Sequence, residues 1–474
     1  MSRGAALSLV RLISGVIRVK VVALALGVGG VGIFSLAQQV NITAVSVVGL
    51  GLAVPIINLG RPSIAAARFA DAGQVAGSAL AILAFNIAVL IVAGLIAGPS
   101  LMQSYGQSDQ WLLWALIAAI ILGAAASSFW EGLSYLSDRF DIYTKAGIAS
   151  ALADMVFIAF GAWTYGLRGA VLALPAGPLV LFLAYALLLR RDRLAQPVLR
   201  NLTFSASQLP RLLSYSAMMF AAVALTNVGL TVARTSVLLS AGPAANGGLQ
   251  TATSLSAYIL AFVTTGFWGH LHARAAADGD TAEVRAELHH ALDRGLLMAF
   301  TGCGLAIVLA DYLLPLFFSS QFISAASLLA VYMPGEFCFQ FLTLLISYQL
   351  TVSLRRRYLA WSLAYVALLV PIALASIPRF GSMGFVAGHA TGSIIALGLA
   401  GFLCWKRGQV RCSLILRAAM LLSILIGTSV FMLLLRDRIG PWSLLAVLPF
   451  VASGARVSWQ LLQGFGLIRQ PQDA

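Results

Sequence analysis

Apolar stretches of about twenty residues recur along the whole chain, separated by short segments that carry most of the charged residues. A stretch of this length crosses the ~30 Å hydrocarbon core of a bilayer as an α-helix, whereas membrane strands show shorter segments of alternating polarity. The predicted helix cores are residues 5–26, 33–59, 78–97, 111–134, 144–163, 169–189, 212–239, 249–269, 292–312, 328–350, 359–377, 383–404, 415–434 and 442–463. The pattern predicts an all-α polytopic membrane protein with about fourteen transmembrane helices.

Basic residues are distributed unequally between the two sets of predicted loops. With a cytoplasmic N-terminus, the outside loops contain only Arg168, Arg379, Arg436 and Arg438, and the other loop arginines and lysines lie inside. This distribution follows the positive-inside rule. We therefore expect both termini to be cytoplasmic.

Composition agrees with this prediction and argues against several other classes of protein. Hydrophobic residues make up 60% of the chain and charged residues 10%, against roughly a quarter charged in a soluble domain. Topology explains the net charge of +14, so we expect no nucleic acid partner. Four cysteines without metal-type spacing predict no metal site, and no phosphate-binding loop for ATP hydrolysis is present. We also expect no cofactor. Without a loop for ATP hydrolysis, a proton or sodium gradient stays open as the energy source.

The two halves of the chain repeat at an offset of 215 residues. The matched pairs are Gly27 with Gly242, Tyr143 with Tyr358, Gly166 with Gly381, Gly169 with Gly384, and Gly177 with Gly392. Because each repeat contains six predicted helices, an even number, the repeats run parallel, as in several transporter folds. We predict an N-lobe at residues 1–200 (helices 1–6), a C-lobe at 201–410 (helices 7–12), and helices 13 and 14 with a short cytoplasmic tail at 411–474.

Charged residues at membrane depth are functional candidates because they are costly to bury there. Arg18 and Lys20 in the first helix and Arg234 in the seventh are predicted to line a cavity that holds an anion such as a phosphate or pyrophosphate. Structural ion pairing is the alternative for each. Glu131, Asp154 and Glu336 could then pair with these cations or carry a coupling proton. His389 is open between a proton relay and a packing histidine.

Amides and hydroxyls are concentrated on helices 2 and 8, which correspond in the two repeats. The candidates for a sugar-lined path are Gln38, Gln39, Asn41, Gln250 and Ser254. Hydrogen bonding between helices is the alternative interpretation.

Several of these segments resemble one known family of flippases. The segments are Leu9–Arg11, Lys20–Leu24, Gly27, Gly30–Gly32, Gly248–Gln250, Ser254–Ser256, Tyr258–Leu260, Leu314–Phe322, Glu336 and Leu354–Tyr358. They are similar to the Wzx-type O-antigen and polysaccharide translocases of the MOP superfamily. The resemblance assigns Lys20 and Arg234 to the family's cavity cations and Glu336 to its helix 10 acid, whereas Ala37 stands where the family often has a basic residue.

The resemblance implies two six-helix lobes around a cleft that opens alternately to the cytoplasm and the periplasm. The implied substrate is an undecaprenyl-pyrophosphate-linked oligosaccharide, which is flipped across the bacterial inner membrane. The resemblance therefore implies a flippase and not an enzyme. Membrane lipid and the glycan polymerase or export machinery are the implied partners. The alternatives are a lipid II flippase and a MATE-like multidrug/cation antiporter; an O-antigen polymerase or ligase is disfavoured because the predicted outside loops are short.

Overall fold

The computed structural model describes residues 3–104, 110–265, 281–351, 355–439 and 446–455, and within these ranges the chain is helical, without strands. Ten of the helices described are long and apolar enough to cross a membrane. An all-α polytopic fold is therefore confirmed, in agreement with the sequence pattern.

The helices follow one another with short connections. They are α1 (Arg3–Gly49), α2 (Ala53–Ala65), α3 (Phe69–Ser104), α4 (Gln110–Ala124), the π-helix η1 (Ala125–Trp130), α5 (Glu131–Leu136), α6 (Phe140–Leu172), α7 (Ala176–Leu189), α8 (Ala195–Arg200), η2 (Ala206–Gln208), α9 (Leu209–Thr265), α11 (Ala282–Val308), α12 (Ala310–Phe317), η3 (Ser320–Ala325), α13 (Ala326–Thr351), α14 (Arg355–Phe380), α15 (Ser382–Lys406) and α16 (Cys412–Ile439).

Three of the longest helices are bent at a glycine. Non-helical backbone occurs at Gly27 within α1, at Gly166 within α6 and at Gly242 within α9. Three of the ten spans contain such a bend, namely Leu7–Ala65, Phe140–Leu172 and Phe220–Ile259, and the apolar helix α7 is shorter than a span. The count of fourteen helices stays a prediction, since most of the fourteenth, at 442–463, lies outside the described residues.

The glycine bends of the two halves share one backbone geometry. Gly27 has φ 63° and ψ −175°, and its repeat partner Gly242 has φ 83° and ψ 175°. A residue with a Cβ is essentially excluded from this combination of positive φ and extended ψ. Glycine therefore lets the chain turn at each bend directly from one helix into the next without a loop.

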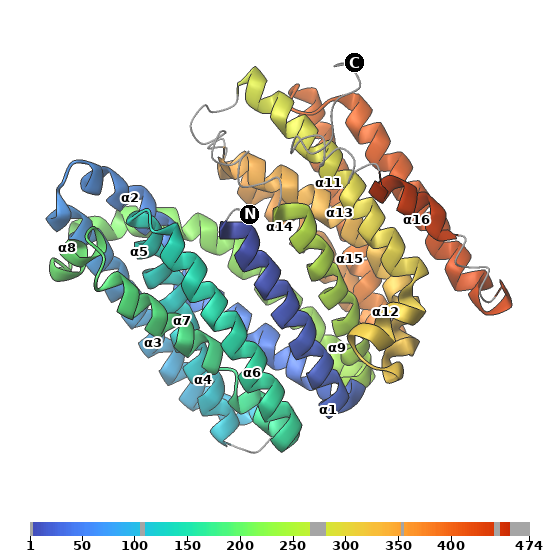
Figure 1. Ribbon diagram of the computed structural model, residues 1–474, viewed down its shortest axis with the longest axis horizontal. Helices are drawn as coiled ribbons and strands as arrows, with labels where there is room; N and C mark the ends of the chain where they lie inside the picture. The colour runs from blue at the N-terminus through green and yellow to red at the C-terminus, as the bar shows by residue number, and fades with distance from the viewer. Residues whose placement is uncertain (1–2, 105–109, 266–280, 352–354, 440–445, 456–474) are drawn as a thin grey trace, which may run out of the picture. The chain divides into compact units, whose positions relative to one another are not determined.

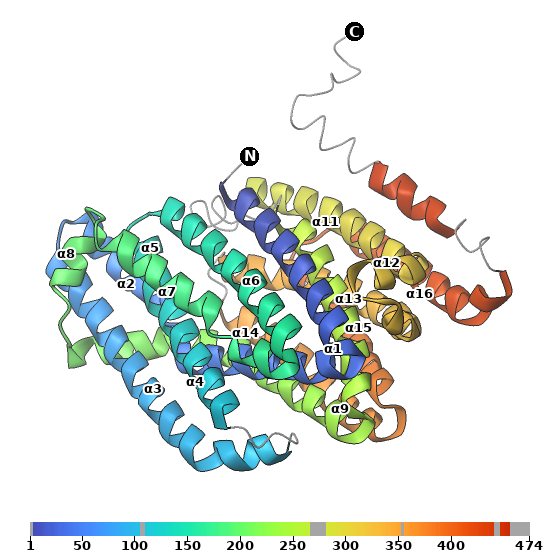
Figure 2. The same ribbon diagram turned by 60° about the horizontal axis from the view of Figure 1, so that its bottom comes forward.

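The N-terminal unit, Met1–Val232, is built around α1. In it α1 packs along α6 and α4, and α6 packs along α7, as Figures 1 and 2 show. Beyond the bend at Gly166 the chain folds back so closely that a Cβ on Gly169 would overlap the carbonyl of Gly161. Small residues of this kind allow the helix backbones in membranes to approach closely.

The C-terminal unit, Ala233–Ala474, has a matching pair of helices. Here α14 packs along α15, α13 lies against α15 and α11, and α16 packs on α11 and α13 (Figure 1). A Cβ on Gly384 would overlap the backbone of Ser376, at the positions equivalent to Gly169 and Gly161. The boundary between the two units falls inside α9, and the predicted lobes 1–200, 201–410 and 411–474 stay predictions.

The second predicted helix, 33–59, is not continuous. The chain leaves the helical conformation at Leu50 and Gly51, which both have positive φ, and α2 starts at Ala53. Likewise the predicted helix 169–189 is interrupted by a turn at Ala173–Pro175 before α7. An apolar pattern does not reveal such breaks, because the residues on both sides are equally hydrophobic.

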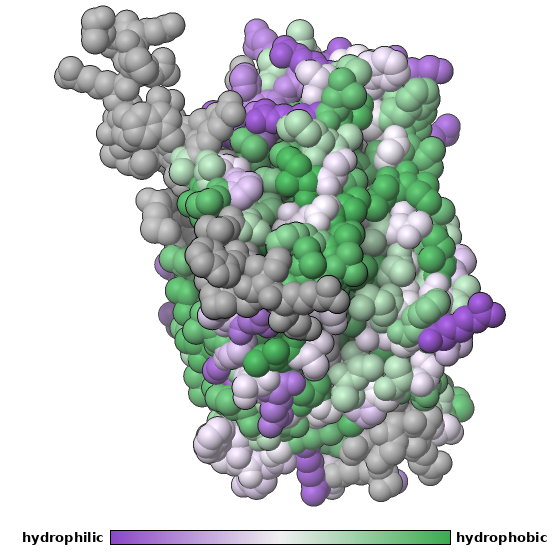
Figure 3. All heavy atoms as spheres, turned by 90° about the vertical axis from the view of Figure 1, so that its right-hand side faces the viewer, coloured by the Kyte–Doolittle hydropathy of each residue, from purple (hydrophilic) through white to green (hydrophobic). Residues whose placement is uncertain are grey.

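Large apolar side chains are exposed on the helices of both units. Phe85, Ile96 and Trp163 in the N-terminal unit and Leu434 in the C-terminal unit are each more than two-thirds exposed. On the face drawn in Figure 3, hydrophobic residues cover the middle, and hydrophilic residues lie mainly toward the two ends. Such a surface suits the hydrocarbon core of a bilayer.

Candidate functional site

Arg234 is a buried cation on α9 of the C-terminal unit. Its side chain is 6% exposed, its Nη2 donates a hydrogen bond of 2.5 Å to Oε1 of Gln250, and its Nε has no hydrogen-bond partner. Among the described residues no carboxylate forms an ion pair with it. A buried charge without a counter-ion costs several kcal/mol, about as much as breaking a buried ion pair. A bound anion would supply the counter-ion that Arg234 lacks among the described residues.

A short polar chain continues from Arg234 across the bend of α9. Gln250 accepts from Arg234 and donates to Oγ of Ser254 at 2.9 Å. These residues lie on both sides of Gly242, so the bend brings the two parts of α9 together. The structure thus places three residues of the predicted site, Arg234, Gln250 and Ser254, in one hydrogen-bonded group.

Glu336 of α13 lies in a second buried polar group of the same unit. Its Oε2 is 3.4 Å from Nε2 of His389 on α15, and both residues are 2% exposed. Gln340 donates to Oε1 of Glu336 at 3.3 Å. The hydroxyl of Tyr365 lies 2.9 Å from Nδ1 of His389, and the ring of Tyr332 stacks on the imidazole with the centroids 4.4 Å apart. Glu336 therefore lies beside a histidine, and its two predicted roles, pairing with a cavity cation and carrying a coupling proton, stay predictions.

Arg18 lies on α1 of the N-terminal unit and has a carboxylate partner. Its Nη1 is 3.7 Å from Oδ2 of Asp154 on α6, and the two side chains are 25% and 30% exposed. Asp154 packs directly on Gly177 of α7, where any Cβ would overlap its carboxylate. The charge of Arg18 is thus largely compensated, unlike that of Arg234. Lys20, also a predicted pyrophosphate residue, is half-buried two residues further along α1.

Glu131 begins α5 directly after the π-helix η1 and is half-buried. Arg11 lies within electrostatic range of Glu131, and its guanidinium is 5.9 Å from the ring centroid of Tyr143. Single π-helical turns occur frequently at functional sites. This turn was not predictable from the sequence, because its residues also suit an α-helix.

The predicted sugar-path residues of α1 form a polar stretch that is only partly satisfied. Gln39 donates to Thr43 at 3.5 Å, and Thr43 in turn lies 2.6 Å from the hydroxyl of Thr231 on α9. Oδ1 of Asn41 is buried without a partner, and Gln38 is half-buried. Thr43 therefore serves helix–helix bonding, while the amides beside it retain unused hydrogen-bonding capacity.

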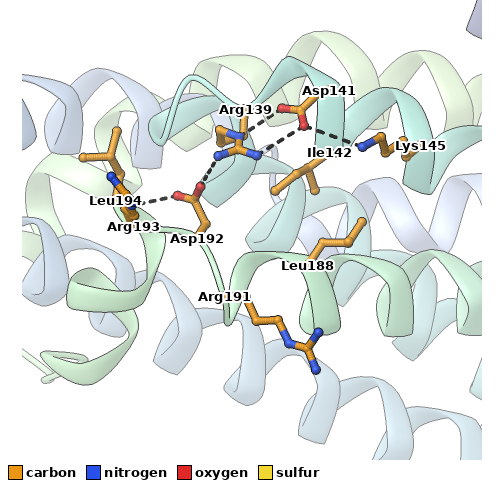
Figure 4. A pocket seen from close by; sticks show the side chains of 9 residues that line it. All are labelled: Arg139, Asp141, Ile142, Lys145, Leu188, Arg191, Asp192, Arg193 and Leu194. Atoms are coloured by element: carbon orange, nitrogen blue, oxygen red, sulfur yellow. Dashed lines mark hydrogen bonds and ion pairs between the residues drawn. The ribbon is translucent and has the colours of Figure 1, made fainter.

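A pocket of about 570 Å³ lies where α6 begins and α7 ends (Figure 4). Arg139 donates to Asp141 at 2.9 Å and to Asp192 at 2.6 Å, which ties the two helix ends together. The hydrogen bond to Asp141 raises the pKa of the Arg139 guanidinium. Asp192 is buried and also accepts from the backbone N–H groups of Leu194 and Ala195 at the start of α8. Sequence analysis assigned these arginines to an inside loop but could not identify the pocket.

Solved structures with the same fold are membrane transporters. A lipid II flippase, MurJ, matches with a TM-score of 0.73 and 12% identity, covering 98% of this chain and 99% of that one. A multidrug resistance MATE family transporter of the MOP superfamily matches with a TM-score of 0.67 and 16% identity, covering 90% and 96%. A third, from Pyrococcus furiosus, is described as a MOP superfamily transporter whose binding pocket has reversed polarity; its TM-score is 0.59, with 16% identity over 89% of this chain and 96% of that one.

The chain has the fold of the MOP superfamily transporters. No protein-family model matches it, and no curated protein matches it either. The fold agrees with that of the superfamily named in the predicted resemblance, and the ten candidate spans agree with a multi-pass membrane protein. The Wzx-type branch, the orientation of the termini and the bacterial inner membrane stay predictions.

Proposed function

We propose that the protein flips an undecaprenyl-pyrophosphate-linked oligosaccharide, such as an O-antigen or exopolysaccharide repeat unit, from the cytoplasmic to the periplasmic leaflet of the bacterial inner membrane. The observation that carries the proposal is Arg234, a buried guanidinium with an unpartnered Nε and no carboxylate partner among the described residues. A pyrophosphate supplies the missing negative charge and accepts hydrogen bonds from several N–H donors at once. Lys20 and Arg18 are the other proposed pyrophosphate ligands.

The polar residues on the same two helices as these cations suit a sugar. Ser254 and Gln250 adjoin Arg234, and Gln38, Gln39 and Asn41 lie on the second part of α1. Neutral amides and hydroxyls bind sugar hydroxyls without the desolvation cost of a charge. The polyprenyl tail remains in lipid, and a change between inward-open and outward-open states transfers the head group. The glycan polymerase or export machinery is the proposed recipient of the product.

The two alternatives have different charge requirements. A multidrug/cation antiporter requires a site that attracts cations, and an uncompensated Arg234 repels them. Lipid II shares the undecaprenyl pyrophosphate, so a lipid II flippase is compatible with the same cations. The match to MurJ, which covers 98% of this chain, supports this alternative. The head group beyond the pyrophosphate is what separates the two flippase hypotheses.

Substrate competition in proteoliposomes tests this proposal. The full chain is reconstituted with a fluorescent undecaprenyl-pyrophosphate oligosaccharide, and flipping is measured as quencher accessibility of the head group. Lipid II and an organic cation are then added as competitors in parallel. We expect flipping of the oligosaccharide that the organic cation does not inhibit. Transport of the cation with no flipping would contradict the proposal, and flipping of lipid II alone would favour the alternative flippase.

A further inference from the structure

Four of the charged side chains that line the pocket of Figure 4 are bonded to one another. Arg139 donates to Asp141 at 2.9 Å and to Asp192 at 2.6 Å. Nζ of Lys145 lies 4.0 Å from Oδ2 of Asp141. Asp192 also accepts from two backbone N–H groups at the start of α8. Two cations and two carboxylates leave this set without net charge, and its bonds hold the beginning of α6 against the end of α7.

Two more arginines line the same pocket and have no such partner. Arg191 and Arg193 stand on either side of Asp192 in the sequence, and both side chains are exposed. Within the described ranges no carboxylate forms an ion pair with either guanidinium. In Figure 4 no dashed line reaches Arg191. Four basic and two acidic side chains give the pocket a net charge of +2, so an anion is the ligand that complements it.

The pocket lies where the apolar part of two helices ends. The apolar helix α7 ends at Leu189, and arginines follow at 190, 191 and 193, while the apolar span of α6 begins at Phe140. A basic cluster directly beside an apolar helix lies at the level of the lipid head groups. Leu188 and Leu194, which also line the pocket, are 38% and 39% exposed. Apolar and cationic side chains thus line one pocket together.

We propose that this pocket binds the phosphoryl head group of an anionic glycerophospholipid of the surrounding membrane. Arg191 and Arg193 donate N–H groups to the phosphoryl oxygens, which the planar guanidinium suits well. Leu188 and Leu194 contact the first methylene groups of the acyl chains. The volume of about 570 Å³ falls within the usual range of ligand sites, ~300–1,000 Å³. Because Arg234 belongs to the other unit, the inference does not rest on the proposed function.

The positive-inside rule explains basic residues in this segment without any ligand. It does not require that they gather around one cavity, and the segment contains arginines of both kinds. Arg190 and Arg200 are also exposed, but they do not line the pocket. Removing either pair takes the same charge from the same segment. A comparison of the two pairs therefore separates a binding site from a general effect of charge.

Lipid binding by the full chain in a neutral detergent tests the inference. No charged membrane surface is present there, so an anionic lipid is retained only where the protein binds it. Native mass spectrometry measures the binding of phosphatidylglycerol and of phosphatidylcholine with the same acyl chains. The wild type is compared with Arg191→Gln combined with Arg193→Gln, and with Arg190→Gln combined with Arg200→Gln as the matched control. Arg191→Lys combined with Arg193→Lys keeps the charge and removes the guanidinium groups.

We expect the wild type to bind phosphatidylglycerol at least about tenfold more tightly than phosphatidylcholine, which is roughly the effect of two basic residues on an anionic lipid. The glutamine variant at 191 and 193 should lose most of this preference, and the matched control should keep it. The lysine variant should keep part of it. Thermal melting without added lipid checks that each variant is folded.

Four outcomes would overturn the inference. Equal binding of the two lipids shows that the pocket does not recognise an anionic head group. An equal loss in the matched control shows a general effect of charge. Displacement of phosphatidylglycerol by glycerol 3-phosphate, at the affinity of the lipid itself, assigns the pocket to a soluble phosphoryl compound. Displacement by farnesyl diphosphate at higher affinity assigns it to a prenyl diphosphate.

Discussion

Gly166 and Gly381, 215 residues apart, adopt the same rare backbone conformation, with φ 61° and ψ −143° at the first and φ 56° and ψ −132° at the second. Each ends one helix and starts the next. Each also lies between two residues that are eight positions apart and in close contact, Gly161 with Gly169 and Ser376 with Gly384. The sequence repeat is thus also a repeat of backbone geometry.

Gly166→Ala is expected to destabilise the protein by about 1–3 kcal/mol, because alanine strains at positive φ. Nothing lies within 4 Å of the added methyl group, so the loss reports the backbone alone. Gly398→Ala is the control, since that helical glycine of α15 also has nothing within 4 Å. Thermal unfolding in detergent should show a clear loss for the first variant and none for the second; equal melting temperatures would contradict the account of the bend.

The contact between Gly177 and Asp154 predicts that substitutions at the two positions have non-additive effects. An alanine at 177 overlaps the Asp154 carboxylate, whereas at the matched Gly392 the added methyl meets Leu369 at 3.1 Å. We expect Gly177→Ala to cost about 1–3 kcal/mol, as overpacking does, and Gly392→Ala to cost less. Asp154→Ala removes the ion pair with Arg18, so it should cost less in the Gly177→Ala background than in the wild type; additive losses would argue against this packing.

The ion pair of Arg18 with Asp154 predicts that folding and transport respond differently to its removal. Arg18→Gln leaves Asp154 without its partner and should cost about 1–2 kcal/mol, less than a fully buried pair because both side chains are a quarter or more exposed. Arg18→Gln combined with Asp154→Asn should restore the melting temperature. If Arg18 also contacts pyrophosphate, flipping by this double variant stays reduced; full flipping would assign Arg18 a structural role only.

Asp192 is expected to stabilise the fold at the pocket of Figure 4. Asp192→Ala removes the partner of Arg139 and the acceptor for two backbone N–H groups of α8, so we expect a loss of about 1–3 kcal/mol. Asp71→Ala is the matched control, because its pair with Arg68 is about half exposed and worth less than about 1 kcal/mol. Similar losses in both variants would show that burial of Asp192 does not matter.

Hydrophobic patterning was sufficient to predict the fold class because membrane helices must satisfy their backbone hydrogen bonds internally and need a fixed apolar length. The glycine spacing also predicted the repeat, because the positive φ at Gly27, at Gly166 and at their repeat partners requires glycine. The breaks at Leu50 and Pro175 were not predictable, because the apolar pattern continues through them. The same is true of the π-helix before Glu131.

Of the candidate site, the residue types were predictable and their partners were not. Arg18 and Arg234 look alike in sequence, as buried arginines in corresponding helices. In the structure Asp154 compensates the first, and within the described ranges only the neutral Gln250 is hydrogen-bonded to the second. That difference depends on which residues α6 and α9 place nearby, and helical periodicity does not specify contacts between helices.

Head-group flipping by Arg234→Ala tests the central claim most directly. The wild type, Arg234→Ala, Arg234→Lys and the exposed-arginine control Arg379→Ala are reconstituted in proteoliposomes with an undecaprenyl-pyrophosphate oligosaccharide. The account predicts flipping by the wild type and by Arg379→Ala, partial flipping by Arg234→Lys, and a loss of at least about tenfold in folded Arg234→Ala, equivalent to ~1.4 kcal/mol. Flipping at the wild-type rate by folded Arg234→Ala would contradict it.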